Sequence, residues 1–274
     1  MGNIKSKKLN DYTFSKTLTE HEIDSYQVLH DVLRTIWNGN FMSPITPLLK
    51  SSGAKVLDVA CGPGNWACEM SSDYQNSTFI GIETVQMFPI QKPNNVEFKL
   101  HEDFNTKFPF EDNSFDFIHM RFCWFYFTFD QWRTTIIKEL VRLLKPGGWL
   151  EFVEITPDGE NLGPVTTDFI EDLKARAQSR HLDPMIPYNL SSILKSTSNL
   201  STKVYHEFRK IPCGSWGGNV GLHHEQAVKG LIIKSIEHLP QKTAQKMIDQ
   251  ILYEFKDLRT YSYCHRIYVQ KLEL

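Results

Sequence analysis

The stretch VLDVACGPGNW, residues 56–66, decides the fold. A short apolar run meets an aspartate and then a Gly-x-Gly turn, and a helix is expected over about residues 64–72. Such apolar runs are typical of strands buried in a parallel sheet, and glycines let the chain turn sharply while a ligand approaches the backbone. The N-terminus of the helix offers free N–H groups. The stretch therefore predicts a strand, a ligand-binding loop and a helix, in that order.

Strands and helices alternate along the rest of the chain. The clearest helical pattern covers residues 130–144, where Asp130 can cap the start and KPGG ends the helix. Strands are expected at 55–60, 77–83, 96–100, 114–120, 149–155, 203–212 and 261–272. Further helices are expected at 20–37, 43–50, 165–181, 189–196, 223–238 and 241–258. This order predicts an α/β fold with a doubly wound, mostly parallel seven-stranded Rossmann-like sheet, an N-terminal helix and a helical lid.

The same pattern divides the chain into four segments. The first is polar, Lys-rich and expected to be flexible, the second a helical cap, the third a ligand-binding core, and the fourth supplies lid helices and the last strands of the same domain. Their bounds are 1–19, 20–50, 51–157 and 158–274.

Composition narrows the class of protein. A net charge of −2 over 274 residues gives no overall field that favours nucleic acid. The five cysteines are odd in number and form no C-x-x-C pair, which favours reduced thiols over a zinc site. No apolar run approaches the roughly 20 residues that span a bilayer, and the N-terminus lacks the apolar core of a secretory signal. We expect a cytoplasmic protein without a metal, with the nucleus as an open alternative.

Two carboxylates indicate which ligand the loop holds. Glu83 ends the second expected strand, where it can accept hydrogen bonds from ribose hydroxyls. The loop itself, Gly62-x-Gly64-x-x-Ala67, also satisfies the dinucleotide pattern. Asp58 discriminates, because a carboxylate there would repel a pyrophosphate but suit a ligand with an ammonium and a sulfonium, such as S-adenosylmethionine. The alternative is that Asp58 only caps the turn or the helix.

Residues 55–155 resemble class I S-adenosylmethionine-dependent methyltransferases. The resemblance rests on four motifs in order: VLDVACGPGNW, FIGIE, HEDFNTKFPFEDNSFDFIHMR and ELVRLLKPGGWLEFVE. The flanks, HEIDSYQVLHDVLRTIWNGNFMSPI and IPCGSWGGNVG, resemble fungal methyltransferases related to regulators of secondary metabolism. That group often carries an arginine near Ser25, and here this charge is missing.

The resemblance implies a role for each matching residue. Asp58 would face the methionine amine, Glu83 the ribose, and Asp103 the adenine amino group. The other implied cofactor contacts are Ala60, Gly62, Gly64, Thr84, Phe104 and Met120. An ordinary turn is the alternative for Asp103 and Phe104. Ala60 stands where the family usually has glycine. A Cβ there is tolerable if the backbone is extended and harmful only at positive φ, and we expect the alanine to be compatible with binding.

The resemblance implies methyl transfer by in-line displacement to a small-molecule or protein acceptor, which needs a base only if the acceptor loses a proton early. His119 is a weak candidate for that base, with a buried core histidine as the alternative. Other candidates, none of them favoured, are His101, Glu154 and His223.

The aromatic run FCWFYFTF, residues 122–129, either forms a wall of the acceptor pocket or packs against the N-terminal helix. Two other functions stay open: a catalytically degenerate regulatory or membrane-tethered protein, and an NAD-dependent oxidoreductase.

The N-terminal sequence MGNIKSKK matches the pattern for N-myristoylation. An acylated Gly2 together with Lys5, Lys7 and Lys8 would support peripheral membrane contact, because one acyl chain alone binds weakly. A chance match is the alternative.

Overall fold

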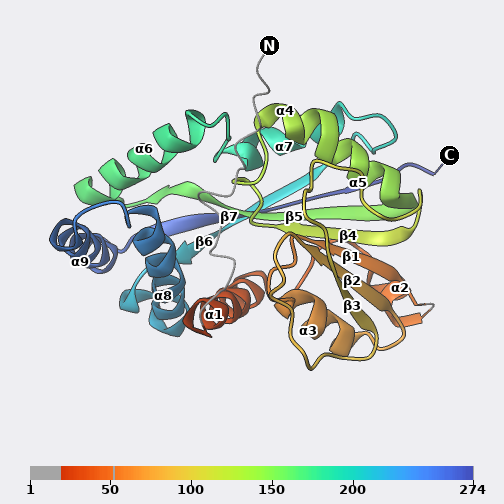
Figure 1. Ribbon diagram of the computed structural model, residues 1–274, viewed down its shortest axis with the longest axis horizontal. Helices are drawn as coiled ribbons and strands as arrows, with labels where there is room; N and C mark the ends of the chain where they lie inside the picture. Colours follow the sequence, from red (N-terminus) through yellow and green to blue (C-terminus); the bar gives the residue numbers. More distant parts are fainter. Residues whose placement is uncertain (1–19, 52, 274) are drawn as a thin grey trace, which may run out of the picture.

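A computed structural model of the protein describes residues 20–51 and 53–273. Seven strands form one sheet in the order β3-β2-β1-β4-β5-β7-β6 (Figure 1). All pairings are parallel except those of β7, which runs antiparallel to β5 and β6. The predicted fold class is thus confirmed. The strands are β1 (Lys55–Val59), β2 (Thr78–Glu83), β3 (Val96–Leu100), β4 (Phe115–Arg121), β5 (Leu144–Glu160), β6 (Tyr205–Pro212) and β7 (Tyr261–Gln270).

The order of the strands reverses between β1 and β4, and this reversal positions the candidate site. In open α/β sheets, ligands bind at such a reversal, beside the carboxyl ends of the two strands. Asp58 of β1 is paired in register with Gly81 of β2 and with His119 of β4. The ends of the three central strands therefore bring the predicted site residues to one edge of the sheet.

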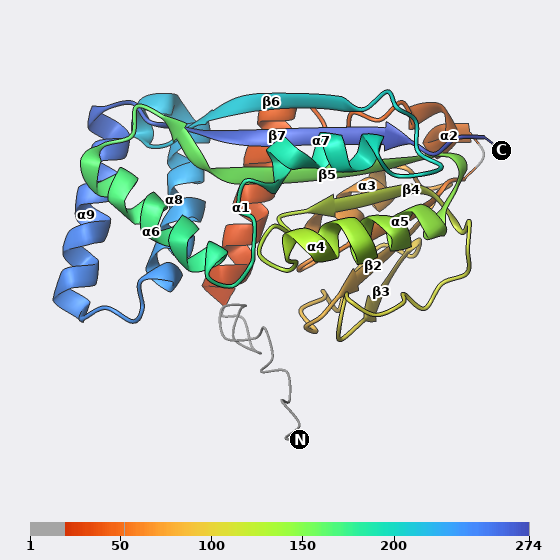
Figure 2. The same cartoon turned by 90° about the horizontal axis from the view of Figure 1, so that it is seen from above.

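Helices cover both faces of the sheet. Figure 1 shows α4, α5 and α7 above the sheet, α1 and α3 below it, and α6, α8 and α9 gathered at one end. Figure 2 shows α7 lying along β5 and β7. The helices are α1 (Glu20–Trp37), α2 (Thr46–Ser51), α3 (Asn65–Asp73), α4 (Phe129–Gln131), α5 (Ile137–Leu143), α6 (Pro164–Gln178), α7 (Ile186–Lys195), α8 (Gly218–Ser235) and α9 (Gln241–Asp257).

The helix predicted at 130–144 differs from expectation in two respects. It begins one residue earlier, at Phe129, because Thr128 caps it: the Thr128 hydroxyl accepts the N–H of Gln131, and the Gln131 side chain accepts the N–H of Thr128. The cap predicted at Asp130 is therefore wrong, since Asp130 already lies within the first turn. A π-helical stretch, Trp132–Ile136, joins α4 to α5. The helix ends at Leu143, just before KPGG, as predicted.

The aromatic run divides between two sides of the sheet. Phe122 has a φ of +58° and packs against Val32 and Leu33 of α1. Cys123 and Phe127 instead lie in the main core with Trp132, on the side of α4 and α5. Packing in a cluster that includes the N-terminal helix therefore accounts for Phe122, and the main core accounts for Cys123 and Phe127.

Some predictions concern residues that are not described. The acylation of Gly2, the basic cluster of Lys5, Lys7 and Lys8, and the flexibility of residues 1–19 all lie outside the described residues and stay predictions. The cytoplasmic location also stays a prediction. Within residues 20–51 and 53–273, no helix has the length and apolar character needed to cross a membrane.

Candidate functional site

The glycine loop joins β1 to α3, and its conformation requires glycine at Gly64. This residue precedes α3 with a φ of +84°, and a Cβ there would lie 2.6 Å from Cε1 of Phe98. Phe98 comes from β3 and stacks on Phe88 with ring centroids 5.0 Å apart. The sequence did not single out Phe98, because nothing local connects β3 with a loop more than 30 residues earlier. Gly62 also has a positive φ, +57°, with Tyr26 of α1 the nearest side chain to its Cβ position.

Ala60 has the backbone conformation in which a Cβ is expected to be harmful. Its φ is +54°, so the backbone there is left-handed and not extended. The chain turns as soon as β1 ends, and the N–H of Cys61 then bonds to the carbonyl of Ile82 at 3.1 Å. A left-handed alanine costs about 1–2 kcal/mol relative to its favoured conformations. Packing of its methyl group against the main core offsets part of this cost.

The left-handed backbone gives a first prediction. Replacement Ala60→Gly should keep the stability within about 1 kcal/mol of the wild type, because strain relief offsets the greater freedom of the unfolded chain. Replacement Ala60→Val should cost at least about 2 kcal/mol, because a β-branched side chain tolerates positive φ poorly. Urea unfolding of both variants measures this. Equal stability of the two variants would contradict the backbone conformation described.

Glu83 ties the end of β2 to the glycine loop. Its side chain is buried, and Oε2 accepts the N–H of Gly62 at 3.0 Å. Oε1 accepts the N–H of Thr84 at 2.6 Å and the Thr84 hydroxyl at 3.1 Å. Burial raises the pKa of Glu83, while the hydrogen bonds from Thr84 and Gly62 oppose that rise. A carboxylate offers about four lone-pair sites. One acceptor site therefore remains for a ligand hydroxyl.

Asp58 and His119 form a buried pair at the ends of β1 and β4. Nδ1 of His119 lies 2.8 Å from Oδ1 of Asp58, and the imidazole stacks on Trp66 at 3.9 Å. Burial lowers the pKa of His119, so the neutral ring donates Nδ1–H to the carboxylate. Oδ2 of Asp58 is buried and has no hydrogen-bond partner among the described residues. A buried acceptor without a partner is costly, so this oxygen fits a ligand that brings a donor.

The geometry favours the core-histidine interpretation of His119. The side chain is 1% exposed, and its two interactions hold it against Asp58 and Trp66. Met120 points to the other side of the sheet, since side chains alternate along a strand, and it lies in the main core. A cofactor contact by Met120 stays a prediction.

The predicted adenine region forms a compact turn. Asp103 is exposed, and its Oδ1 accepts the N–H of Asn105 at 2.9 Å and the Asn105 amide at 3.0 Å. Phe104 is buried, with its ring 5.9 Å from Phe108 and 5.8 Å from Tyr126. These contacts match the ordinary turn that was the alternative. The adenine contacts of Asp103 and Phe104 stay predictions.

The remaining base candidates lie in different surroundings. His101 approaches the Thr106 hydroxyl at 3.3 Å, and His223 is exposed on α8. Glu154 is fully buried, and burial raises its pKa to about 8. Its Oε1 accepts the N–H of Cys123 at 2.6 Å, and its Oε2 has no partner among the described residues. Glu154 is therefore mostly protonated at neutral pH.

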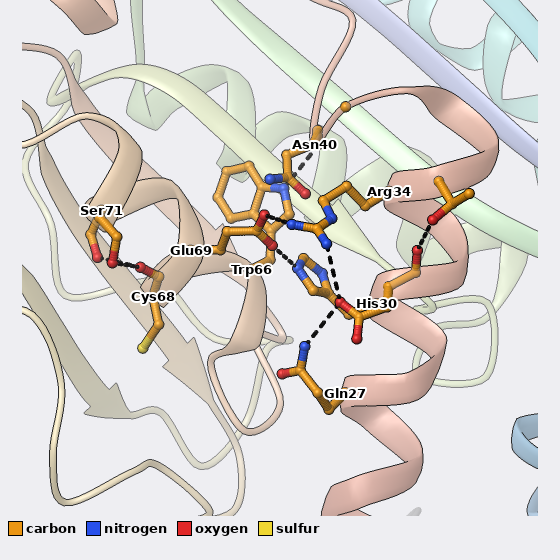
Figure 3. A network of polar contacts seen from close by, with 12 residues as sticks. Gln27, His30, Arg34, Asn40, Trp66, Cys68, Glu69 and Ser71 are labelled. Atoms are coloured by element: carbon orange, nitrogen blue, oxygen red, sulfur yellow. Dashed lines mark hydrogen bonds and ion pairs between the residues drawn. The ribbon is translucent and has the colours of Figure 1, made fainter. Parts of the chain in front are cut away.

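A polar network between α1 and α3 was missed by the sequence reasoning. Glu69 of α3 contacts Nε2 of His30 and, at 2.5 Å, Nη1 of Arg34 (Figure 3). On the other side of the imidazole, Nη1 of Arg121 lies 3.1 Å from Nδ1 of His30. The i, i+4 spacing of His30 and Arg34 places both on one helix face and was the available signal. Their partner, 39 residues after His30, could not be found from local patterns.

No metal centre is found within the described residues. No group of three or more His, Cys, Asp or Glu side chains is arranged there to hold an ion. The five cysteines are Cys61, Cys68, Cys123, Cys213 and Cys264, and none forms a disulfide.

Comparison with known proteins identifies the core. Residues 56–148 match the methyltransferase domain family. The chain is 28% identical over 137 residues to the secondary metabolism regulator LAE1 of Cochliobolus heterostrophus, covering 50% of this chain and 44% of that protein. It is 24% identical over 197 residues to the protein-methionine methyltransferase laeA of Emericella nidulans, covering 69% and 51%. The chain thus spans about half the length of these curated relatives.

A solved structure agrees in fold. The S-adenosylmethionine-dependent methyltransferase from Thiobacillus denitrificans, in complex with S-adenosylhomocysteine, aligns with a TM-score of 0.51 at 15% identity. The alignment covers 89% of this chain and 98% of that one, and at this identity it supports the fold alone. Residues 56–148 thus match the methyltransferase domain family, and the chain as a whole resembles the LaeA-like proteins of fungi.

Proposed function

We propose that this protein transfers the methyl group of S-adenosylmethionine to a thioether sulfur of a protein methionine. The observation that carries the cofactor assignment is the buried Oδ2 of Asp58, which has no partner among the described residues and lies beside the glycine loop. A dinucleotide would bring a pyrophosphate to this carboxylate, and like charges repel. An ammonium group would instead supply the missing hydrogen bond.

The residues at the carboxyl ends of β1 and β2 match this cofactor in their chemistry. Gly62 and Gly64 allow the methionine part to approach the backbone, and Asp58 receives its ammonium group. Glu83 offers its remaining lone pair to a ribose hydroxyl. Bound S-adenosylmethionine supplies the electrophilic methyl group, so the protein binds, orients and excludes water.

The proposed acceptor follows from the chemistry of the site and from the name of the Emericella nidulans relative. A thioether attacks through a lone pair and loses no proton, so methyl transfer to it needs no base. The methyl–sulfur bond of the cofactor breaks as the new carbon–sulfur bond forms, and the positive charge passes to the acceptor sulfur. His119 is bound to Asp58, and the buried Glu154, with its pKa near 8, is a poor base at neutral pH.

Labelled S-adenosylmethionine tests the proposal. The protein is incubated with peptides that contain methionine and with matched peptides that contain norleucine in its place. We expect label in the methionine peptides alone, because norleucine keeps the shape of the side chain but has no sulfur. Transfer to another residue or to a small molecule would support methyltransferase activity but would contradict the proposed methionine acceptor.

Glu83 gives a quantitative prediction for cofactor binding. Replacement Glu83→Ala should weaken the affinity for S-adenosylmethionine by about 1–3 kcal/mol, because a charged hydrogen-bond partner of the ribose is lost. The same change frees the N–H of Gly62 and loosens the loop. Glu83→Gln keeps an acceptor oxygen and should lose less. Calorimetric titration compares the variants, and an unchanged affinity in Glu83→Ala would remove this residue from the site.

A further inference from the structure

Arg121 lies at the carboxyl end of β4, two residues beyond His119. Within the described part of the chain, its guanidinium hydrogen bond goes to Nδ1 of His30 at 3.1 Å, and no carboxylate lies within ion-pair distance. Burial lowers the pKa of Arg121, and the negative charge of Asp58 is the main opposing influence. A guanidinium stays protonated even so. A positive charge is thus held at the edge of the sheet with little local compensation.

The partner of Arg121 on α1 cannot neutralise this charge, because His30 is itself neutral. Burial, followed by the charge of Arg121, lowers the pKa of His30 to about 4. A guanidinium can only donate, so Nδ1 of His30 accepts and its Nε2–H donates to Glu69. Glu69 also receives Nη1 of Arg34 at 2.5 Å, as Figure 3 shows, so the charge of that carboxylate is already paired.

The matching anion is on the neighbouring strand. Asp58 is the second-last residue of β1, and its pairing with His119 places it near the end of β4. Its Oδ2 is buried without a partner among the described residues. A cation and an anion therefore lie at the ends of adjacent strands, next to the glycine loop. The free end of an amino acid carries the complementary pair, a carboxylate and an ammonium group.

Resting on the proposed use of S-adenosylmethionine, we propose that Arg121 binds the α-carboxylate of its methionine part while Asp58 receives the ammonium group. A cavity of about 10 Å³ borders Arg121, His30, His119 and Trp66, which is room for one water or one carboxylate oxygen. His30 is a positioning residue that orients the guanidinium from α1. Through Glu69 it also joins Arg121 to α3, the helix that begins at the glycine loop.

A comparison of two ligands on two variants tests this assignment. S-adenosylhomocysteine carries the carboxylate, and S-adenosyl-3-thiopropylamine differs by lacking it but keeps the amine. The wild type should bind the first about 10- to 100-fold more tightly, the usual effect of a hydrogen bond between charged groups. In Arg121→Gln that preference should fall to within about threefold, through weaker binding of S-adenosylhomocysteine alone. Arg209→Gln is the matched control and should keep the wild-type preference, because Arg209 is an exposed residue of β6 that is paired with Glu207.

The outcomes separate the possible roles of Arg121. A purely structural role would weaken both ligands equally in Arg121→Gln and preserve the preference, which would overturn the assignment. A wild type that binds both ligands equally would also overturn it while leaving the proposed function intact. A wild type that binds neither ligand would overturn both proposals. If thermal unfolding shows that Arg121→Gln does not fold, Arg121→Lys replaces it in the test. This variant keeps the charge and should show an intermediate preference for S-adenosylhomocysteine. A full wild-type preference in Arg121→Lys would contradict the need for a guanidinium.

Discussion

Replacement Glu154→Gln is expected to make the protein more stable than the wild type at alkaline pH, with no such gain at acidic pH. Burial raises the pKa of Glu154 from 4.5 to about 8, so the folded state holds this proton more tightly than the unfolded state. The resulting stabilisation is complete below about pH 4.5 and is lost as the pH rises through about 8. A shift of this size corresponds to about 3–5 kcal/mol. Glutamine cannot ionise, so the variant escapes this loss.

Denaturant unfolding at several pH values measures the effect. The free energy of unfolding of Glu154→Gln minus that of the wild type should grow between pH 5 and pH 8.5, by about 3–5 kcal/mol. At pH 5 the variant should be slightly less stable, because the amide adds a donor to a site where Oε2 has no partner among the described residues. Glu97→Gln, an exposed change of the same kind on β3, serves as the control and should give a nearly constant difference. A constant difference for Glu154→Gln would show that Glu154 is not the buried neutral acid described.

Replacement Gly64→Ala should destabilise the protein by about 2–4 kcal/mol and greatly weaken binding of S-adenosylmethionine. Part of this cost comes from the φ of +84°, which L side chains rarely adopt, and part from an overlap with the Phe98 ring, whose Cε1 would lie 2.6 Å from the new Cβ. Moving that ring disturbs its stacking on Phe88. The loop would then present a displaced backbone to the cofactor. Thermal unfolding and calorimetric titration of the same preparation measure both effects.

A second glycine provides the matched control for this change. Gly230 lies within α8, where an added Cβ meets nothing within 4 Å. Gly230→Ala should raise the stability by about 0.5–1 kcal/mol, because alanine is the better helix former. The same substitution is therefore expected to have opposite signs at the two positions. If both variants behaved alike, the left-handed conformation and close packing at Gly64 would be refuted.

Patterns within one element were sufficient to predict the sheet and the glycine loop. The apolar run at 55–60 became β1, and all seven predicted strands are present, because burial and strand period are local properties of the sequence. The predicted ends of one strand were wrong. β5 extends from Leu144 to Glu160, well beyond the predicted 149–155, because β7 pairs with it over most of that length. The sequence contains the capping pair of Thr128 and Gln131 as a T-x-x-Q pattern, but Asp130, two residues later, is also a residue type that caps helices.

Features that depend on distant pairings could not be predicted. The left-handed backbone at Ala60 is set by how the chain leaves β1 beside Ile82 of β2, and not by the residue type. The neutral state of His30 follows from burial and from the nearness of Arg121, 91 residues away. The site residues were named by resemblance, but their charges and hydrogen-bond partners became apparent only from the tertiary structure.

The central claim is that the glycine loop with Asp58 and Glu83 holds S-adenosylmethionine and not a dinucleotide. Isothermal titration of the purified protein with S-adenosylmethionine and, separately, with NADH tests it most directly. The account predicts saturable binding of S-adenosylmethionine with one site per chain, competition by S-adenosylhomocysteine, and no heat from NADH. Binding of NADH alone, or of neither ligand, would contradict it.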